Sequence, residues 1–134
     1  MTWTVSDDEY DGVLKAGAAK QYSYLVSRCA DWGEVWGLAI AGGDWAMMAD
    51  GDGVRFAVWP HRRYAEACRQ RHWSDREPTP IDVESFVDDL IPRLIEDVVG
   101  IAAFPLPDGR FTPVSARRLR SDLEGELDRI GGAV

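Results

Sequence analysis

Cysteine and histidine are scarce in this chain of 134 residues. Its only two cysteines are Cys29 and Cys68, and its only two histidines are His61 and His72. With no CxxC pair and no secretory hydrophobic segment, the cysteines are expected to be reduced thiols, as in a cytosol. No apolar run approaches the roughly 18 residues that a membrane helix needs, so we expect no membrane partner.

The sequence also lacks the motifs of nucleotide binding and of common catalytic centres. Its glycines form neither GxGxxG nor a phosphate-binding P-loop, and no nucleophile elbow accompanies either cysteine. A pair of Cys29 or Cys68 with His61 is disfavoured, because both cysteines take inward positions on amphipathic helices, where thiols are usually inert. We therefore expect neither an enzyme nor a cofactor.

Metal binding is disfavoured by the spacing of the available ligands. His61, Cys68 and His72 share one stripe of a continuous helix, but that stripe is about 16 Å long, and one zinc ion needs three or four converging ligands. The segment 50–53 resembles a calcium loop only superficially. The twelve-residue ligand pattern is absent, and Asp and Gly also suit a tight turn. No metal is expected.

The chain begins with a polar segment. Residues 1–17 are acidic and contain glycine, and we interpret them as a loosely attached N-terminal arm. Residues 18–32 place apolar side chains at helical spacing, and Gly33 suits the left-handed residue that ends a helix. We expect residues 18–134 to form a single domain, a size that buries a core without disulfides or metal.

Three short strands are expected at 35–40, 45–48 and 54–59. Gly42-Gly43 and the segment 50–53 provide tight turns between them. This pattern predicts an antiparallel three-strand meander.

The second half of the chain alternates helices and short strands. We expect a helix at 61–71, a loop at 73–80, an edge strand at 81–83, a helix from Glu84 or Ser85 that is disturbed at Pro92, strands at 100–104 and 111–114, and a last helix capped by Ser115. The inward positions of the last helix are Leu119, Leu123, Leu127 and Ile130. The order αβββα(β)αββα predicts an α+β fold, in which helices pack on a mainly antiparallel sheet.

Several spaced motifs carry a resemblance to one family. They are Gly33-Glu34-Val35-Trp36-Gly37-Leu38, Trp45, Val58-Trp59-Pro60-His61, Tyr64-Ala65, Ile81-Asp82-Val83-Glu84-Ser85-Phe86, Leu90-Ile91-Pro92 and Ala103-Phe104-Pro105. Over roughly residues 19–128 the chain resembles bacterial proteins grouped as domain of unknown function 2750. That resemblance implies a fold, a bacterial protein and no catalytic residues. The reduced thiols expected above add a cytoplasmic location. At the level of fold alone, the element order also resembles enhanced-serine-sensitivity domains and small immunity proteins of toxin systems.

Tryptophan is abundant, with six residues. Both faces of the strand at 35–40 are largely apolar. We expect one face to meet the helices and the other to expose Trp36, with Trp45 or Trp59 beside it, unless helices cover both faces. Exposed aromatic clusters are typical of interfaces. Trp36, Trp45 and Trp59 are therefore candidate protein-binding residues.

A second candidate lies at the start of the helix at 61–71. Residues 54–76 carry a net charge of +4, and the N–H groups and dipole of a helix N-terminus favour an anion. The alternative is a solvated basic helix end. The possible anion-binding residues are His61, Arg62 and Arg63. An alternative function follows: a small-ligand sensor or an uncharacterised enzyme that uses the Trp59-Pro60-His61-Arg62 corner.

The third candidate is an acidic surface. The chain carries a net charge of −8, of which residues 77–109 contribute −7 with Arg93 as their only basic residue. Its carboxylate pairs suit solvation better than acid–base catalysis. Such a field repels nucleic acid and favours a basic protein partner. The sequence therefore predicts a non-enzymatic protein-binding module, in its more specific form an immunity or antitoxin-type protein. The expected interface residues are Asp82, Glu84, Asp88 and Asp89.

Overall fold

The computed structural model describes residues 4–41, 43–51 and 53–131. The helices are α1 (Asp7–Lys15), α2 (Ala18–Trp32), α3 (Arg62–His72), α4 (Val83–Ser85), the π-helical turn η1 (Phe86–Leu90), α5 (Ile91–Glu96) and α6 (Ala116–Gly131). The strands are β1 (Glu34–Ala39), β2 (Met47–Asp50), β3 (Gly53–Val58), β4 (Glu77–Asp82), β5 (Gly100–Ala103) and β6 (Thr112–Val114). The α+β class is confirmed, and from α2 onward the elements follow the expected order.

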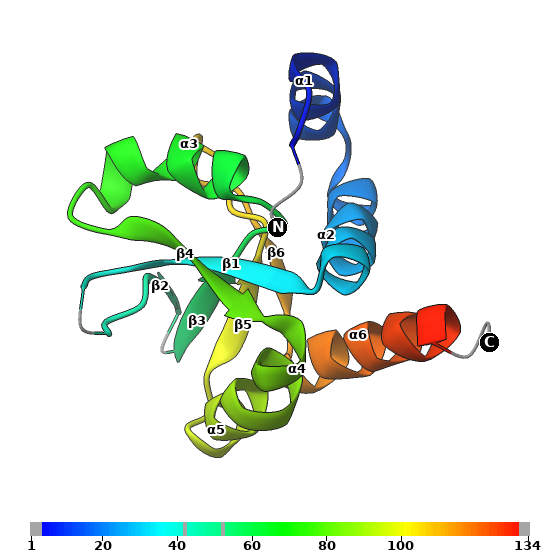
Figure 1. The fold of residues 1–134 in the computed structure, drawn as a ribbon. Helices are drawn as coiled ribbons and strands as arrows, with labels where there is room; N and C mark the ends of the chain where they lie inside the picture. The colour runs from blue at the N-terminus through cyan, green and yellow to red at the C-terminus, as the bar shows by residue number, and fades with distance from the viewer. Residues whose placement is uncertain (1–3, 42, 52, 132–134) are drawn as a thin grey trace.

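The strands form a two-stranded ribbon, β1–β4, and a four-stranded sheet in the order β2-β3-β5-β6. Among the strands of the described residues, only the β3–β5 pair is parallel; the other pairs are antiparallel. In Figure 1 the ribbon crosses the four-stranded sheet, with α3 on one side of it and α4 and α5 on the other. Helices α2 and α6 pack against each other at the remaining side.

The expected three-strand meander is only partly present. The β2–β3 hairpin is confirmed, but β1 pairs with β4 along its length. Among the described residues, the backbone of β1 pairs with the segments that follow it through the isolated bridges Trp36–Trp59 and Ala39–Trp45. The physical reason is that the chain turns away from β1 after Trp45, the residue that forms the bridge to Ala39. Strand β2, which follows, therefore pairs with β3 alone. A continuous meander is therefore wrong.

The segment expected as a loop at 73–80 contains most of strand β4. Its Pro78 and Pro80 lie opposite Leu38 and Trp36 of β1. The backbone N–H and C=O of Trp36 bond to Trp59 at 2.9 and 2.8 Å and so point away from β4. The prolines therefore occupy positions where no N–H is needed within the ladder, as edge-strand prolines do. They also remove two N–H groups from the outer edge, which protects it against pairing with another chain.

The disturbance expected at Pro92 is present as η1. Proline cannot donate a backbone hydrogen bond, and the turn before it widens so that the Ile91 N–H bonds to the Phe86 carbonyl. The helix begins earlier than expected, because Asp82 caps it by accepting from the Ser85 N–H at 3.0 Å. The residues on the inner face are buried: Val83, Phe86, Val87, Ile91 and Leu94.

Within residues 4–17, part of the segment expected as a loosely attached arm, Asp7–Lys15 form helix α1 and Val5 lies against the domain. Ser6 accepts from the Glu9 N–H and begins α1, whose first turn is acidic and whose last turn holds Lys15. Both features stabilise a helix through its cap and dipole. Val5 is 5% exposed and belongs to the core, and Asp7 pairs with Arg63 at 2.7 Å.

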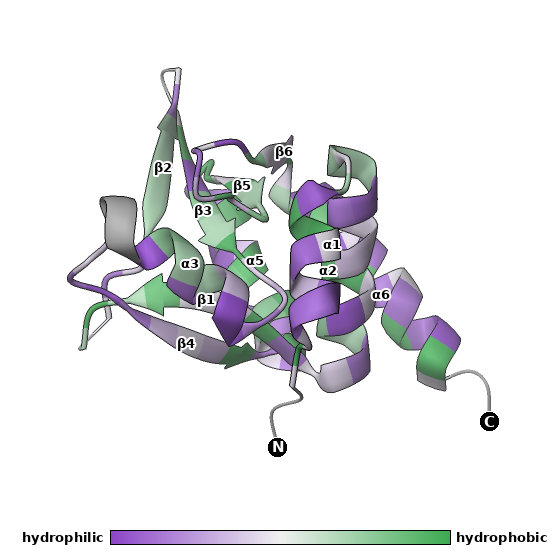
Figure 2. Cartoon of the chain, turned by 90° about the horizontal axis from the view of Figure 1, so that it is seen from above, coloured by the Kyte–Doolittle hydropathy of each residue, from purple (hydrophilic) through white to green (hydrophobic). Residues whose placement is uncertain are grey.

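The last helix is capped as expected, since Ser115 accepts from the Arg118 N–H at 3.0 Å. Leu119 and Leu123 are buried, and Leu127 is partly buried. The inward position expected for Ile130 is wrong: it is 40% exposed, because α6 runs past the edge of the domain (Figure 1). The colouring of Figure 2 places hydrophobic residues on the central strands and hydrophilic ones along the outer faces of α1 and α6.

Candidate functional site

An exposed acidic face covers α4, η1 and α5. It consists of carboxylates that alternate with the buried residues of the same helices, so burial of the apolar stripe turns them all toward solvent. These residues are Asp82, Glu84, Asp88, Asp89, Glu96 and Asp97. The four acidic residues named from the sequence as candidates lie together on this face.

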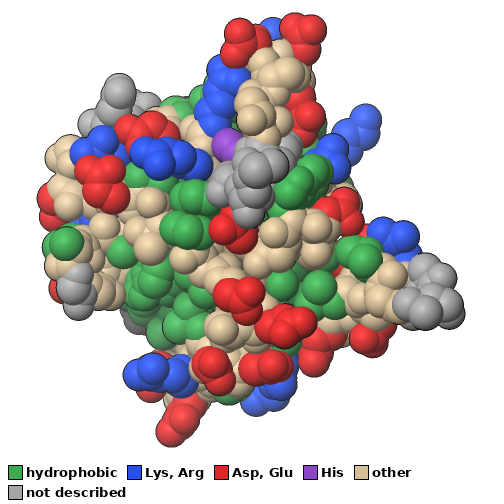
Figure 3. All heavy atoms as spheres, in the orientation of Figure 1, with side chains coloured by type: hydrophobic (Ala, Val, Ile, Leu, Met, Phe, Trp, Pro, Cys, Tyr) green, Lys and Arg blue, Asp and Glu red, His purple; other side chains and the backbone are tan. Residues whose placement is uncertain are grey.

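The acidic face has almost no compensating charge. Within the described chain, Glu84, Asp88, Asp89, Glu96 and Asp97 make no ion pair, although arginines elsewhere pair with carboxylates, as in Arg55–Asp50 at 2.7 Å. In Figure 3 Asp and Glu side chains gather over α4, α5 and the adjoining part of α6, where few Lys or Arg side chains lie. Repulsion among these charges persists until another molecule supplies positive charge.

A hollow lies between this face and α6. It is lined from the η1 side by Glu84, Val87 and Asp88 and from α6 by Glu124, Leu127 and Asp128. Glu124 has only a distant partner, Arg120 at 3.8 Å. The hollow thus has an apolar floor and an acidic rim, and the exposed Ile130 lies one turn further along α6 from Leu127. Such a surface suits an apolar side chain flanked by basic ones.

The tryptophan surface expected from the sequence is absent. Trp36 is 4% exposed and Trp59 is fully buried, while Trp45 is partly buried. The Trp59 indole N–H donates to the Pro105 carbonyl at 2.9 Å, and its ring meets Trp73 edge-on. Both faces of β1 are therefore covered, which was the alternative left open by the sequence. Trp36 and Trp59 serve the core and offer no surface to a partner.

The predicted anion-binding residues lie close together, but two of them, His61 and Arg63, have hydrogen-bond partners within the chain. The His61 Nδ1 accepts from the Arg63 N–H at 3.0 Å and so caps α3 itself. The Arg63 guanidinium donates to the Val5 carbonyl at 3.1 Å and to Asp7 at 2.7 Å. Only Arg62 of the three is fully exposed. The Trp59-Pro60-His61-Arg62 corner is thus largely buried, which disfavours the sensor or enzyme alternative.

The two cysteines are buried thiols. Burial raises the pKa of Cys68 to about 12, and its Sγ bonds to the Pro105 carbonyl at 3.1 Å. Burial also raises the pKa of Cys29. A neutral buried thiol is a poor nucleophile and a poor metal ligand. Among the described residues no group of three or more His, Cys, Asp or Glu side chains could hold a metal ion.

A tyrosine cluster that the sequence reading missed lies beneath α1. Tyr24 of α2 donates to Glu9 at 2.5 Å, and its hydroxyl lies 3.1 Å from that of Tyr64 in α3. Burial raises the pKa of both phenols, and the bond to Glu9 adds to the effect at Tyr24. Tyr10 of α1 stacks on Tyr64 with centroids 5.2 Å apart. Ser6 followed by three acidic residues is typical of a helix start and could have indicated α1, but no sequence pattern indicates the contact between Tyr24 and Tyr64.

Comparisons with known proteins identify a family and no activity. In the described part of the chain, no helix is both long enough and apolar enough to span a membrane. No curated protein and no solved structure matches the chain. The model of the family described as Protein of unknown function (DUF2750) matches residues 22–123, which run from within α2 to the middle of α6 and leave α1 outside. The chain belongs to the DUF2750 family.

Proposed function

We propose that this protein is a non-enzymatic binding module that takes a basic partner protein on its acidic face. The observation that carries the proposal is the set of exposed carboxylates from Glu84 to Asp97 that lack ion-pair partners within the described chain. A native surface that keeps like charges together loses stability through repulsion, and a basic partner relieves that repulsion on binding. The acidic rim around Val87 and Leu127 adds an apolar anchor point to the charge.

A strained residue beside these carboxylates supports the same face. Val98 has φ 57 and is 86% exposed, directly after Glu96 and Asp97. A β-branched residue in the left-handed region is unfavourable, and an exposed one gains no compensating burial. The left-handed conformation closes α5, because the Val98 and Val99 N–H groups donate to the Ile95 and Leu94 carbonyls, and it leaves the apolar Val98 side chain exposed beside the acidic face. We propose Val98 as an apolar contact at the end of the acidic face.

In its more specific form the proposal is an immunity or antitoxin-type protein of a bacterial cytoplasm that neutralises a toxin by occlusion. This form is supported by analogy of element order and by the acidic face, which could cover a basic active surface. It predicts a toxin gene next to the gene for this chain. Co-expression of that toxin with the protein should restore growth, and co-expression with the variant Asp88→Lys, Asp89→Lys should restore it less.

The proposal is tested by comparing three immobilised baits in extracts of the native host. These are the wild-type protein, the variant Asp88→Lys with Asp89→Lys, and the control Asp11→Lys with Asp44→Lys. The control changes the net charge equally at exposed residues outside the acidic face, Asp11 in α1 and Asp44 between β1 and β2. We expect at least one partner to bind the wild type and the control and to be lost from the acidic-face variant. A partner that binds all three baits equally would contradict the proposal.

A further inference from the structure

The surface beneath α1 has the chemistry of a binding site for an acidic helix. Its floor is aromatic: Tyr64 is 1% exposed, and its ring meets Phe104 edge-on at 4.9 Å. Phe104 reaches this position with φ 53, an unfavourable backbone conformation for a non-glycine residue. The Tyr24 and Tyr64 hydroxyls lie at the same floor, 3.1 Å apart. The floor therefore combines apolar area with hydroxyl donors.

Two arginines flank this floor. The Arg28 guanidinium of α2 lies over the rings of Tyr24 and Trp32, at 5.3 and 4.8 Å from their centroids. The Arg63 guanidinium of α3 lies over the ring of Tyr10. Arginines held against aromatic rings are preorganised for binding carboxylates. Flanked in this way, the tyrosine floor favours a segment that presents carboxylates on both sides of an aromatic ring.

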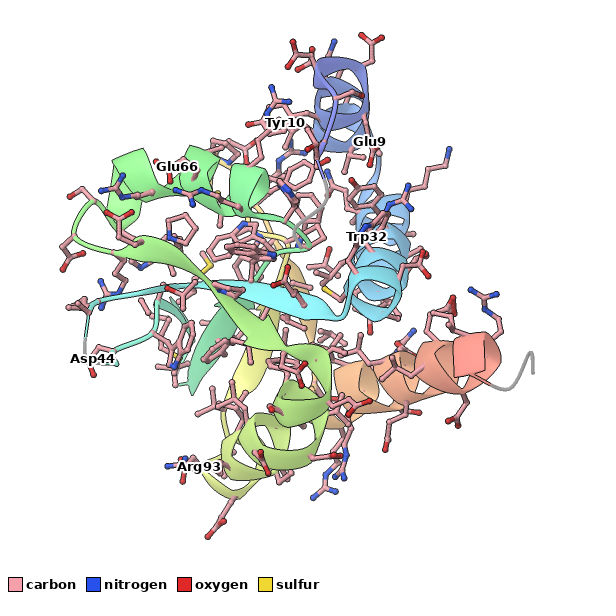
Figure 4. All side chains as sticks on the ribbon, in the orientation of Figure 1. Glu9, Tyr10, Trp32, Asp44, Glu66 and Arg93 are labelled. Atoms are coloured by element: carbon pink, nitrogen blue, oxygen red, sulfur yellow. The ribbon has the colours of Figure 1, made fainter. Side chains whose placement is uncertain are left out.

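Helix α1 supplies that pattern from within the chain (Figure 4). Glu9 accepts from Tyr24 and lies 3.8 Å from Arg28, while Asp7 pairs with Arg63 at 2.7 Å. Tyr10 fills the space between, stacked on Tyr64 and 4.1 Å beneath the Arg63 guanidinium. Three side chains within four residues thus contact Tyr24, Arg28, Arg63 and Tyr64.

The attachment of α1 is nevertheless weak. No residue of α1 is buried, and the segment joins α2 through Ala16 and Gly17, where Gly17 supplies no side-chain cap. Tyr10, Val13 and Leu14 are only partly buried against the core. The remaining contacts of α1 are exposed and polar and contribute little stability, so α1 can open at a free energy well below that of global unfolding. Tyr24, Arg28, Arg63, Tyr64 and Phe104 all lie within the region matched by the family, whereas α1 lies outside it.

We propose that the surface of Tyr24, Arg28, Arg63 and Tyr64 binds an acidic helical segment of a partner protein, and that α1 occupies this site as an exchangeable cover. The partner segment presents two carboxylates and an aromatic ring in the spacing of Asp7, Glu9 and Tyr10. A cover tethered by a short linker acts at an effective concentration of about millimolar, so it excludes weak ligands until it is released or outcompeted. This site is separate from the acidic face and does not depend on the proposed function.

The test uses the full chain and a fluorescein-labelled peptide of residues 4–17 as the probe. In the cover-released variant Asp7→Asn, Glu9→Gln, Tyr10→Ala, we expect fluorescence anisotropy to show the peptide binding at least about tenfold more tightly than to the wild type. A peptide with the same three substitutions should not bind. Adding Arg63→Ala to the cover-released variant should weaken binding at least about tenfold, whereas Arg62→Ala, an exposed neighbour on α3, should leave it unchanged.

Hydrogen exchange provides the second measurement. The amides of α1 should exchange faster than those of α2 in the wild type, and excess unlabelled peptide should accelerate them further as it takes the place of α1. If the triple variant fails to unfold cooperatively, Glu9→Gln alone is used, since it removes only one partly exposed carboxylate. The proposal is overturned if a folded, cover-released variant does not bind the peptide, if it binds the control peptide equally well, or if α1 exchanges as slowly as α2.

Discussion

The ring of Trp45 packs directly against the backbone of Gly37 in β1. A β carbon built on Gly37 would lie 2.8 Å from Cε3 of Trp45, a distance at which one of the two must move. Trp45 also meets Phe56 with centroids 5.6 Å apart. The bridge between Ala39 and Trp45 brings the indole to this position. This contact connects the β1–β4 ribbon to the four-stranded sheet.

Gly37→Ala should therefore destabilise the fold by about 1–3 kcal/mol, the usual effect of overpacking. Urea denaturation measures the change. Gly125→Ala is the control, because a β carbon there meets nothing within 4 Å and alanine favours a helix interior by up to about 1 kcal/mol. Combining Gly37→Ala with Trp45→Leu should cost less than the sum of the two single changes. Strict additivity would show that the ring does not occupy the space above Gly37.

The exposed Val98 gives a prediction of opposite sign. Val98 and Val99 close α5 by donating to Ile95 and Leu94 at 3.1 and 2.8 Å, the arrangement in which glycine is preferred at the left-handed position. Val98→Gly should raise the free energy of unfolding by about 1 kcal/mol. Val54→Gly, at another exposed valine but within β3, should lower it. If Val98 contacts a partner, the stabilised variant should bind that partner less tightly. Destabilisation by Val98→Gly would contradict the strain argument.

The buried thiols predict how stability falls in alkali. Burial raises the pKa of Cys68 from 9.0 to about 12, and that of Cys29 is raised as well, so the folded state favours the neutral thiols. Their contribution is complete below pH 9 and is lost as the pH rises from 9 toward the folded pKa. Each thiol should cost about 1.4 kcal/mol of stability between pH 8 and pH 10.

The measurement is urea denaturation of the wild type and of Cys29→Ala with Cys68→Ala at several pH values. The double variant should be less stable at pH 7, because it loses buried volume, and its stability should fall less steeply above pH 9. Neither thiol of the native wild type should react rapidly with a maleimide at pH 7. Rapid labelling, or equal alkaline slopes in the two proteins, would show that the thiols are accessible.

The sequence predicted local elements well and long-range pairing poorly. The cap at Ser115, the helix end at Gly33 and the disturbance at Pro92 are local, because each is decided by one residue's backbone chemistry. The pairing of β1 with β4 is not local, and Pro78 and Pro80 concealed it because prolines normally argue against a strand. Only the direction of the hydrogen bonds of Trp36, toward Trp59, shows that prolines fit there.

The same division between local and long-range features holds for the candidate sites. The acidic face follows directly from the amphipathic pattern of residues 82–97, so its exposure could be expected. The sequence could not decide whether Trp36 is exposed, because an apolar strand has the same sequence pattern whether one or both of its faces are covered. The cluster of Tyr24 and Tyr64 joins α2 to α3 across 40 residues, and no short-range pattern signals such a contact.

The last prediction separates stability from binding on the acidic face. Asp88 and Asp89 are exposed, carry like charge and have no ion pair within the described chain, so their mutual repulsion and that of Glu84 oppose folding. Asp88→Lys with Asp89→Lys should raise the free energy of unfolding by a few tenths of a kcal/mol. With the captured partner, the same variant should lower the association rate about tenfold at low salt, since steering by a charged surface acts on the encounter. In about 1 M salt, where the Debye length is roughly 3 Å, the difference should largely vanish.

The control Asp11→Lys with Asp44→Lys should keep the wild-type association rate at every salt concentration, because the net charge changes equally but away from the acidic face. If the association rate changes neither with salt nor with the substitutions at Asp88 and Asp89, the acidic face is not part of the interface. Equal slowing by the control would assign the effect to net charge alone.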